Sequence, residues 1–172
     1  MTAALENAVG ALALALSDDI HTSIQSAGLV HSEAEAIGHL GHAPGLAISH
    51  LADAISLSHA ATVRLVARLE DRGLVDRSPS ETDGRTVLLK LTQRGKDLHA
   101  GQMRERQYKI RAALKTLNYD EQVMLSELST KVLRELIRDE SHAFRICRLC
   151  NRPICDSCPV ETEMMRREPV QS

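Results

Sequence analysis

The chain has 172 residues, a formal net charge of −2 and an aromatic content of 2%. This length predicts one domain, or one domain with a tail. The overall charge excludes a protein that holds nucleic acid through a uniformly basic surface, so any attraction to DNA must be local. With so few aromatic residues the core must consist of Leu, Ile, Val and Ala, which suits helices.

The N-terminal segment predicts two helices and a short strand. Residues 3–27 carry apolar side chains at helical spacing, on a face too apolar for a helix that stands alone. Ser32 and Glu35 have the spacing of a capping box that opens a second helix. After a Pro-Gly break, residues 46–48 could form a strand that pairs with a later hairpin.

The apolar run at residues 9–16 does not predict a membrane or export segment. It is too short to cross a bilayer, and Glu6 precedes it where a leader peptide would have a basic flank. We therefore expect a soluble, cytoplasmic protein with no membrane partner.

Residues 49–95 predict two helices, a hairpin and the start of a third helix. Ser49 is the expected cap of a short helix, and Ser58 caps a second helix that runs to Arg72. Gly73 follows where a left-handed C-cap residue is expected. Residues 74–77 and 86–91 then predict two strands joined by turn-forming residues. This order is the winged helix-turn-helix plan for reading duplex DNA.

The second of these helices has two different faces. One face is expected to pack on the domain and carries Thr62, Leu65, Val66 and Leu69. The opposite face carries Ala60, Val63, Arg64, Ala67 and Arg68. Alanines permit close approach to a groove, Val63 suits a thymine methyl group, and the arginines suit guanine edges or phosphates. A solvated surface helix with ordinary arginines is the alternative that this face alone leaves open.

The charge is distributed unevenly along the chain. Residues 1–57 contain six acidic residues and no Lys or Arg, whereas residues 58–96 contain eight basic and five acidic residues. Residues 97–172 contain thirteen basic and twelve acidic residues. The positive excess therefore lies on the predicted reading head, where binding to DNA needs it.

A set of short motifs is distributed in order over this segment. They are Leu51-Ala52, Ser56-Leu57-Ser58, Thr62, Leu69-Glu70, Arg72-Gly73-Leu74-Val75-x-Arg77, Asp83-x-Arg85 and Leu91-Thr92-x-x-Gly95. With these motifs the chain resembles the DNA-binding core of the MarR family of bacterial transcription regulators. The resemblance implies a mainly α fold with a small β-wing, and a homodimer on a pseudo-palindromic site in double-stranded DNA. It also implies that Arg85 enters the minor groove, held by Asp83; Gly84 departs from the family pattern, in which many members have a second arginine.

The helix faces and the resemblance together give the expected DNA-binding residues. They are Ser56, Ser58, His59, Ala60, Thr62, Val63, Arg64, Arg68, Arg77, Asp83, Arg85 and Thr86. His59 begins the recognition helix, where it is placed to meet a phosphate or a base.

The two ends of the chain predict dimerisation helices. A long helix is expected from Gln93 to Leu117, and a capping box at Asn118 and Glu121 opens a final helix to about Ile146. The resemblance implies that residues 1–30 and 97–146 interlock two chains around residues 31–96, the DNA-binding part, within a domain of residues 1–146. A monomer in which these helices pack on each other is the alternative.

Residues 147–172 form a cysteine-rich tail beyond the MarR-like core. All four cysteines lie here as two CxxC pairs, Cys147 with Cys150 and Cys155 with Cys158. Reduced thiols with this spacing favour a metal centre over a disulfide framework in a cytoplasmic protein. The metal would be Zn²⁺, the commonest use of paired CxxC, or an iron–sulfur cluster, and a metal-free thiol switch is the third interpretation.

The histidines do not show the spacing of a helical metal site, and we interpret His39, His42 and His50 as ordinary surface or interface residues. The lack of aromatic residues argues against a stacked phenolic effector, so the expected effector is another small molecule or a redox signal. No catalytic constellation is present, and we expect a regulator, not an enzyme. The alternatives are a CxxC-dependent redox enzyme on a winged-helix scaffold and a winged helix that binds protein instead of DNA.

Overall fold

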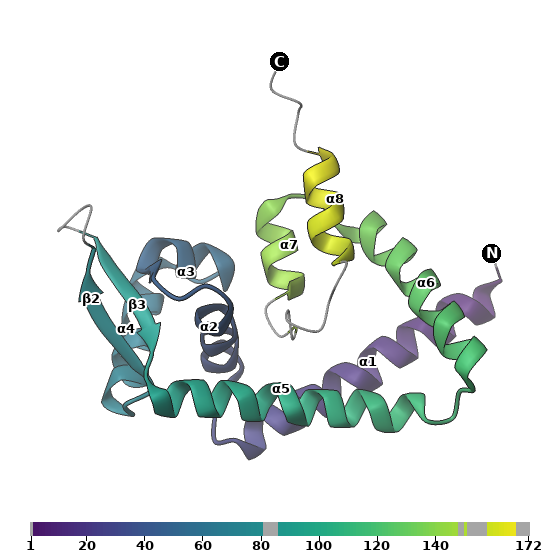
Figure 1. Cartoon of the computed structure of the whole chain (residues 1–172), viewed down its shortest axis with the longest axis horizontal. Coiled ribbons are helices and arrows are strands. Elements are labelled where there is room, and N and C mark those ends of the chain that lie inside the picture. Colours follow the sequence, from purple (N-terminus) through teal and green to yellow (C-terminus); the bar gives the residue numbers. More distant parts are fainter. Residues whose placement is uncertain (1, 81–85, 148–149, 151–157, 168–172) are drawn as a thin grey trace.

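The computed structural model describes residues 2–80, 86–147, 150 and 158–167, which form eight helices and three strands. In chain order the elements are α1 (Ala3–Ser26), α2 (His31–His42), β1 (Leu46–Ala47), α3 (Ile48–Ala54), α4 (His59–Asp71), β2 (Val75–Pro79), β3 (Val87–Leu91), α5 (Gln93–Leu114), α6 (Tyr119–Leu136), α7 (Glu140–Cys147) and α8 (Pro159–Arg167). The sheet and α2–α4 lie at one end of α5, α6 follows its other end, and α7 and α8 lie between them (Figure 1). The predicted mainly α fold with a small β-wing is confirmed.

The sheet is antiparallel, with strand order β1-β3-β2. β1 pairs with β3 through Leu46 opposite Leu89, and β2 pairs with β3 from Val75 opposite Leu91 outward. Alternation along β3 buries Leu89 and Leu91 and exposes Lys90 between them, as the period of two requires. Val87 is on the same face as Leu89 and is exposed at the outer end of the strand. The predicted short strand before the recognition unit therefore exists, and it attaches that unit to the wing.

One apolar core holds the winged part together. Ile37 and Leu40 of α2, Leu51 of α3, and Leu65 and Leu69 of α4 are fully buried in it. α2 is buried on most sides, from Ala36 to Leu40 without a gap, whereas the buried residues of α4 recur at helical spacing on one face. The packed α2–α4 unit therefore presents the opposite face of α4. The core contains Leu, Ile, Val and Ala without any aromatic side chain.

Two predicted helix starts are wrong. α3 begins at Ile48 with Ala47 as its N-cap, not at Ser49, because pairing with β3 fixes the chain as a strand up to Ala47. α2 begins at His31, so the capping box at Ser32 and Glu35 does not form. Instead the backbone N–H of Val30 donates to the carboxylate of Glu33, at 3.3 Å.

The predicted C-terminal helix is divided in two. The capping box at Asn118 and Glu121 is confirmed, with both reciprocal hydrogen bonds formed at 3.0 and 2.8 Å. α6, however, ends at Leu136, where Ile137 takes extended backbone angles and buries its side chain against α7 and α8. Burial of this residue favours a break over a continuous helix, and α7 turns back toward α3.

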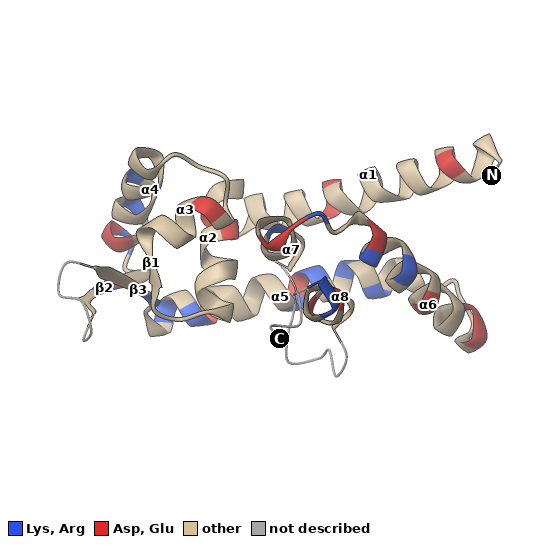
Figure 2. Cartoon of the chain, turned by 90° about the horizontal axis from the view of Figure 1, so that it is seen from above, with Lys and Arg blue, Asp and Glu red and all other residues tan. Residues whose placement is uncertain are grey.

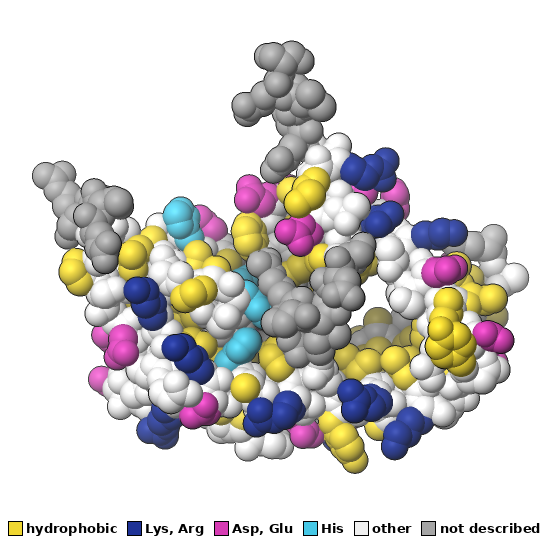
Figure 3. All heavy atoms as spheres, in the orientation of Figure 1, with side chains coloured by type: hydrophobic (Ala, Val, Ile, Leu, Met, Phe, Trp, Pro, Cys, Tyr) yellow, Lys and Arg dark blue, Asp and Glu magenta, His cyan; other side chains and the backbone are white. Residues whose placement is uncertain are grey.

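The long helices carry much unburied apolar surface. Ile24 is the single buried residue in α1, and α6 has none. Figure 3 shows hydrophobic side chains gathered over the end of the molecule that α6 occupies.

Charge is distributed unevenly over the helices. In Figure 2, the charged residues of α1 are all acidic, whereas Lys and Arg occur on α4 and α5. No helix within the described residues is both long and apolar enough to cross a membrane.

Candidate nucleic-acid interface

α4 begins and ends through local backbone chemistry. Ser58 caps it, since its Oγ accepts from the backbone N–H of Ala61 at 3.3 Å, as the sequence predicts. Ser56 in the preceding turn has a positive φ of 55°, which is unusual for a residue other than glycine. Gly73 ends the helix with a φ of 66°, in the left-handed region where glycine is preferred. The turn and both ends of α4 are therefore fixed independently of any ligand.

The buried and exposed faces of α4 are those that the spacing predicts. Thr62, Leu65, Val66 and Leu69 are buried, and His59, Ala60, Arg64 and Arg68 are exposed. Thr62 is fully buried, and its hydroxyl donates to the backbone carbonyl of Ser58 at 3.1 Å. Its side chain therefore belongs to the core and the turn, and Thr62 does not join the exposed surface that Ala60 and Arg64 share.

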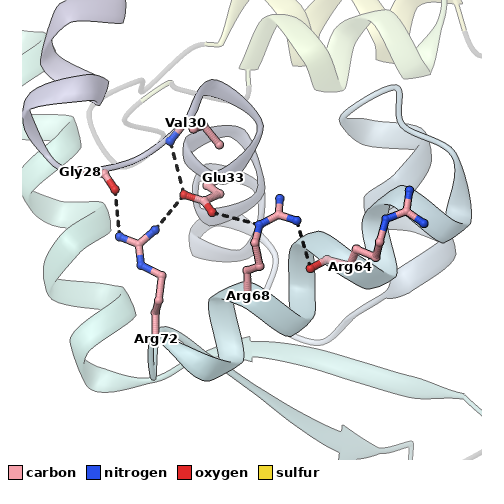
Figure 4. Close-up of polar contacts among 6 residues, drawn as sticks. All are labelled: Gly28, Val30, Glu33, Arg64, Arg68 and Arg72. Atoms are coloured by element: carbon pink, nitrogen blue, oxygen red, sulfur yellow. Dashed lines mark hydrogen bonds and ion pairs between the residues drawn. The ribbon is translucent and has the colours of Figure 1, made fainter.

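A buried carboxylate holds two arginines of the recognition unit (Figure 4). Glu33 of α2 accepts from Arg72 at 2.8 Å and forms an ion pair with Arg68 at 3.6 Å. Arg72 also donates to the backbone carbonyl of Gly28, at 3.0 Å. The Glu33 side chain is 7% exposed, whereas Arg68 and Arg72 are 54% and 37% exposed. The buried carboxylate therefore fixes α4 against the start of α2 through two arginines that keep part of their surface in water.

Arg64 differs from the neighbouring arginines in that it forms no ion pair with a described residue. Arg77 pairs with Glu70 at 2.6 Å, and Arg68 and Arg72 pair with Glu33. For the exposed side chain of Arg64, no ion pair is formed within the described part of the chain. Its guanidinium is therefore available to a phosphate or a guanine without loss of an existing contact.

The wing is described up to the base of its loop. The backbone N–H of Ser80 donates to the carbonyl of Thr86 at 2.9 Å, which closes the hairpin beyond the last strand pair. Thr86 is half-buried at this point. The two predicted minor-groove residues, Asp83 and Arg85, lie outside the described residues.

α7 reaches the turn before the recognition helix. The guanidinium of Arg145 donates to the hydroxyl of Ser56 at 3.1 Å, across 89 positions of sequence. α7 also packs on α3. The C-terminal part of the chain therefore contacts one of the residues predicted to bind DNA.

Three of the four cysteines lie where α7 and α8 meet. Cys147 ends α7 and is buried in an apolar cluster, and Cys158 at the start of α8 packs against the same cluster. The backbone N–H of Cys150 donates to the carbonyl of Cys147 at 2.9 Å. Cys155 lies outside the described residues. Within the described residues, no set of three potential ligands is arranged to hold a metal ion.

The histidines cluster more than their spacing predicts. Figure 3 shows imidazole side chains on the winged part where it faces α7. His42 and His99 meet edge to face, with ring centroids 5.3 Å apart. Burial lowers the pKa of His99 from its ordinary value of 6.5.

Sequence reasoning missed two residues of the site, Glu33 and Arg145. Both act over long sequence separations, 39 residues from Glu33 to Arg72 and 89 from Arg145 to Ser56. Neither lies at a spacing that indicates its partner. The apolar spacing of α2 could have indicated that Glu33 is buried, and a buried carboxylate needs a partner of opposite charge.

The fold and the exposed face of α4 define a winged helix-turn-helix protein. Residues 27–86 match the MarR family. Over 78 residues the chain is 42% identical to an uncharacterized HTH-type transcriptional regulator of Mycobacterium leprae, covering 45% of this chain and 53% of that protein. It is 33% identical over 82 residues to the HTH-type transcriptional regulator YfiV of Bacillus subtilis, covering 48% and 51%. The chain thus spans about half the length of these relatives.

Solved structures extend the likeness of fold beyond the matched segment. RV1404 from Mycobacterium tuberculosis has a TM-score of 0.73 at 21% identity, over 80% of this chain and 97% of that one. A mutant MepR from S. aureus bound to an oligodeoxyribonucleotide has a TM-score of 0.62 at 17% identity, over 77% and 98%. Most of the chain therefore shares the fold of these structures.

Proposed function

We propose that the chain is a sequence-specific DNA-binding transcription regulator of the MarR type that acts as a homodimer in the cytoplasm. The observation that carries this proposal is the rigid presentation of the exposed α4 face, with Arg64 at its centre. The relatives named as transcriptional regulators, and the DNA-bound structure of similar fold, support it. They give no support to the two alternatives, a CxxC-dependent redox enzyme and a protein-binding winged helix.

The proposed contacts divide into two groups. Ala60 and Val63 approach the base edges, and Arg64 and His59 bind guanine or phosphate. Ser56, Ser58, Arg68, Arg77 and Thr86 lie around them and contact the sugar-phosphate backbone, and Asp83 and Arg85 belong to the wing. Arg68 and Arg77 must share their guanidinium groups with Glu33 and Glu70, so each contributes less to affinity than Arg64.

The experiment is a DNA-binding titration on sites selected from a random duplex library by the purified protein. Arg64→Ala should weaken binding to the selected site by about ten- to hundredfold, since a direct contact is worth about 1–3 kcal/mol. Arg111→Ala, an exposed arginine on α5, is the matched control and should leave the affinity unchanged. Equal affinity of the Arg64 variant and the control would exclude α4 as the reading element.

For the tail we propose a metal or redox role, supported by the residues alone. Cys147, Cys150 and Cys158 come from the junction of α7 and α8, and thiolates at such a junction suit Zn²⁺ or an iron–sulfur cluster. Either group would tie α8 to α7, and a cluster would in addition respond to oxidants. An anaerobic preparation should contain about one zinc per chain and be colourless, or contain iron and sulfide with visible absorption. A preparation with neither would leave a thiol switch as the role of the cysteines.

A further inference from the structure

The turn between α3 and α4 contains a serine in a backbone conformation that favours glycine. Ser56 has a φ of 55°, and within the described residues it is the one position other than glycine with a positive φ. Glycine reaches this left-handed region without a steric penalty, whereas a residue with a Cβ atom does not. Gly73, which ends α4 with a φ of 66°, follows the usual rule. A serine in this turn therefore calls for a compensating contact.

The hydrogen bonds of the turn depend on this conformation. Ser56 donates its backbone N–H to the carbonyl of Asp53 at 3.2 Å, and Leu57 donates its backbone N–H to the carbonyl of Ala52 at 3.0 Å. This pair of bonds defines the Schellman motif, in which the residue after the C-cap of a helix is left-handed. Because α4 begins at His59, directly after the motif, the conformation of Ser56 sets the direction in which the recognition helix leaves the turn.

The compensating contact comes from α7, which packs on α3. The guanidinium of Arg145 donates to the hydroxyl of Ser56 at 3.1 Å. Neither glycine nor alanine could accept this bond, so the serine connects the turn to α7. α7 lies outside residues 27–86, and the contact is therefore added by a segment beyond the MarR-family match.

α7 is itself held in place by the end of the chain. Its buried residues pack in an apolar cluster with α8 and with Ile137, which precedes α7. Arg167, the last residue of α8, donates to the backbone carbonyl of Ile137 at 2.6 Å. Arg145 is half-buried and extends from this packed unit, so less side-chain entropy is lost when it bonds to Ser56 than for an arginine on a free helix.

We infer that Arg145 is a positioning residue for the recognition helix, because it holds Ser56 in the left-handed conformation and so fixes the direction of α4. Arg145 acts through Ser56 and not through a contact of its own with DNA. Without this bond the turn adopts other conformations in a fraction of the molecules, and the apparent affinity for DNA falls by that fraction. The consequence for DNA rests on the proposed function, whereas the effect on the turn does not.

The effect on the turn is measured without DNA, by amide hydrogen exchange of the full chain followed by NMR. The N–H of Leu57 bonds to Ala52 when Ser56 is left-handed, so its protection reports this conformation. Arg145→Gln should lower the protection of the Leu57 amide by about three- to tenfold. Adding Ser56→Gly should restore it, because glycine adopts the conformation without help.

The matched control is Arg138→Gln, which removes an exposed arginine just before α7 and should leave the Leu57 amide unchanged. Circular dichroism confirms that each variant folds. Undiminished protection of Leu57 in the folded Arg145→Gln variant would overturn the inference.

The consequence for DNA is measured by titration on the selected site. Ser56→Ala and Ser56→Gly both lack the hydroxyl, so any direct contact of this group with DNA is lost in both. The alanine variant should nevertheless bind about threefold or more weakly than the glycine variant, because it cannot relieve the strain of a positive φ. Arg145→Gln should weaken binding by about three- to tenfold in the natural chain and by less than about twofold in the Ser56→Gly background.

Salt dependence separates positioning from a direct contact. An arginine that binds a phosphate contributes about 0.9 to the slope of log K against log salt concentration, so its loss would lower the slope by that amount per chain. We expect Arg145→Gln to leave the slope unchanged. A lower slope, or a full loss of affinity in the Ser56→Gly background, would mean that Arg145 contacts DNA itself and would contradict the inference.

The two experiments fail independently. A chain that binds DNA through Arg64, and whose Arg145→Gln variant keeps both its affinity and the protection of Leu57, overturns the role of Arg145 and leaves the proposed function intact. A chain whose Leu57 amide responds as expected, and which binds no selected DNA, supports the role of Arg145 in the turn and refutes the proposed function.

Discussion

Gly95 allows the start of α5 to approach the strand that follows the recognition helix. A Cβ atom at this position would lie 2.1 Å from the backbone carbonyl oxygen of Leu74. Thr92 donates its backbone N–H to the same oxygen at 3.1 Å, so the carbonyl cannot move without breaking this bond. We expect Gly95→Ala to lower the free energy of unfolding by about 3 kcal/mol, measured by urea denaturation.

Gly101 provides the matched control, because it lies in the same helix and a Cβ atom there meets nothing closer than 3.9 Å. Gly101→Ala should raise the free energy of unfolding by up to about 1 kcal/mol through helix propensity. Similar stabilities of the two variants would show that the close approach at Leu74 does not exist in solution.

His99 makes stability depend on pH. Because burial lowers its pKa in the folded state, the unfolded chain takes up a proton at the ordinary value of 6.5, and the folded chain does so at a lower pH. Stability from this residue is therefore complete above pH 6.5 and is lost as the pH falls through the folded-state value. Between about pH 7.5 and about pH 5.5, His99→Gln should lose less stability than the natural chain. The control is His59→Gln, a substitution of an exposed histidine, whose free energy of unfolding should fall with pH as much as that of the natural chain. A fall as small as that of His99→Gln would refute the assignment to His99.

At the scale of elements, Glu33 sets the position of α4. Glu33→Gln removes a buried charge that two arginines share, and we expect the free energy of unfolding to fall by about 1–3 kcal/mol. Glu70→Gln breaks the more exposed pair with Arg77 and should cost less than about 1 kcal/mol. Chemical denaturation of both variants measures the difference. A larger cost for Glu70→Gln would mean that burial does not govern these two pairs.

The elements most accurately predicted from sequence are those fixed by local chemistry. The Ser58 cap, the left-handed Gly73 and the capping box at Asn118 are formed as predicted, because each depends on residues within one turn. The buried face of α4 also follows from its period, and this period already placed Thr62 in the core.

The features of the fold that could not be predicted from the sequence depend on contacts between distant segments. Nothing near Ile137 predicts a helix break, because its cause is burial against α7 and α8. Glu33 was not expected to pair with α4, since residue spacing carries no information about partners on another helix. The gathering of histidines beside α7 was missed for the same reason: α7 returns to α3 only in the folded chain.

At the scale of the whole molecule, the exposed apolar face of α6 is a candidate contact surface for the proposed homodimer. Leu128 and Val132 are 52% and 57% exposed, and Met124 and Leu136 continue the stripe at intervals of one turn. An exposed apolar stripe of this kind is typical of an interface between chains. Because the winged part sits at the far end of α5, pairing through the terminal helices would place two recognition helices apart, each free to reach one half-site.

The proposed dimer predicts that Leu128→Glu with Val132→Glu will yield a monomer, since two carboxylates cannot be buried unpaired at an apolar contact. Sedimentation velocity at micromolar concentration measures the change. Ser126→Glu is the control, because Ser126 is exposed on the opposite side of the same helix and should leave the dimer intact. The monomer should keep its circular dichroism, as neither residue contributes to a buried core. It should also bind a two-half-site DNA far more weakly than the dimer, because its second half-site contact is no longer linked to the first. A double variant that still sediments as a dimer would require the interface to lie away from α6, and the exposed stripe would then need another partner.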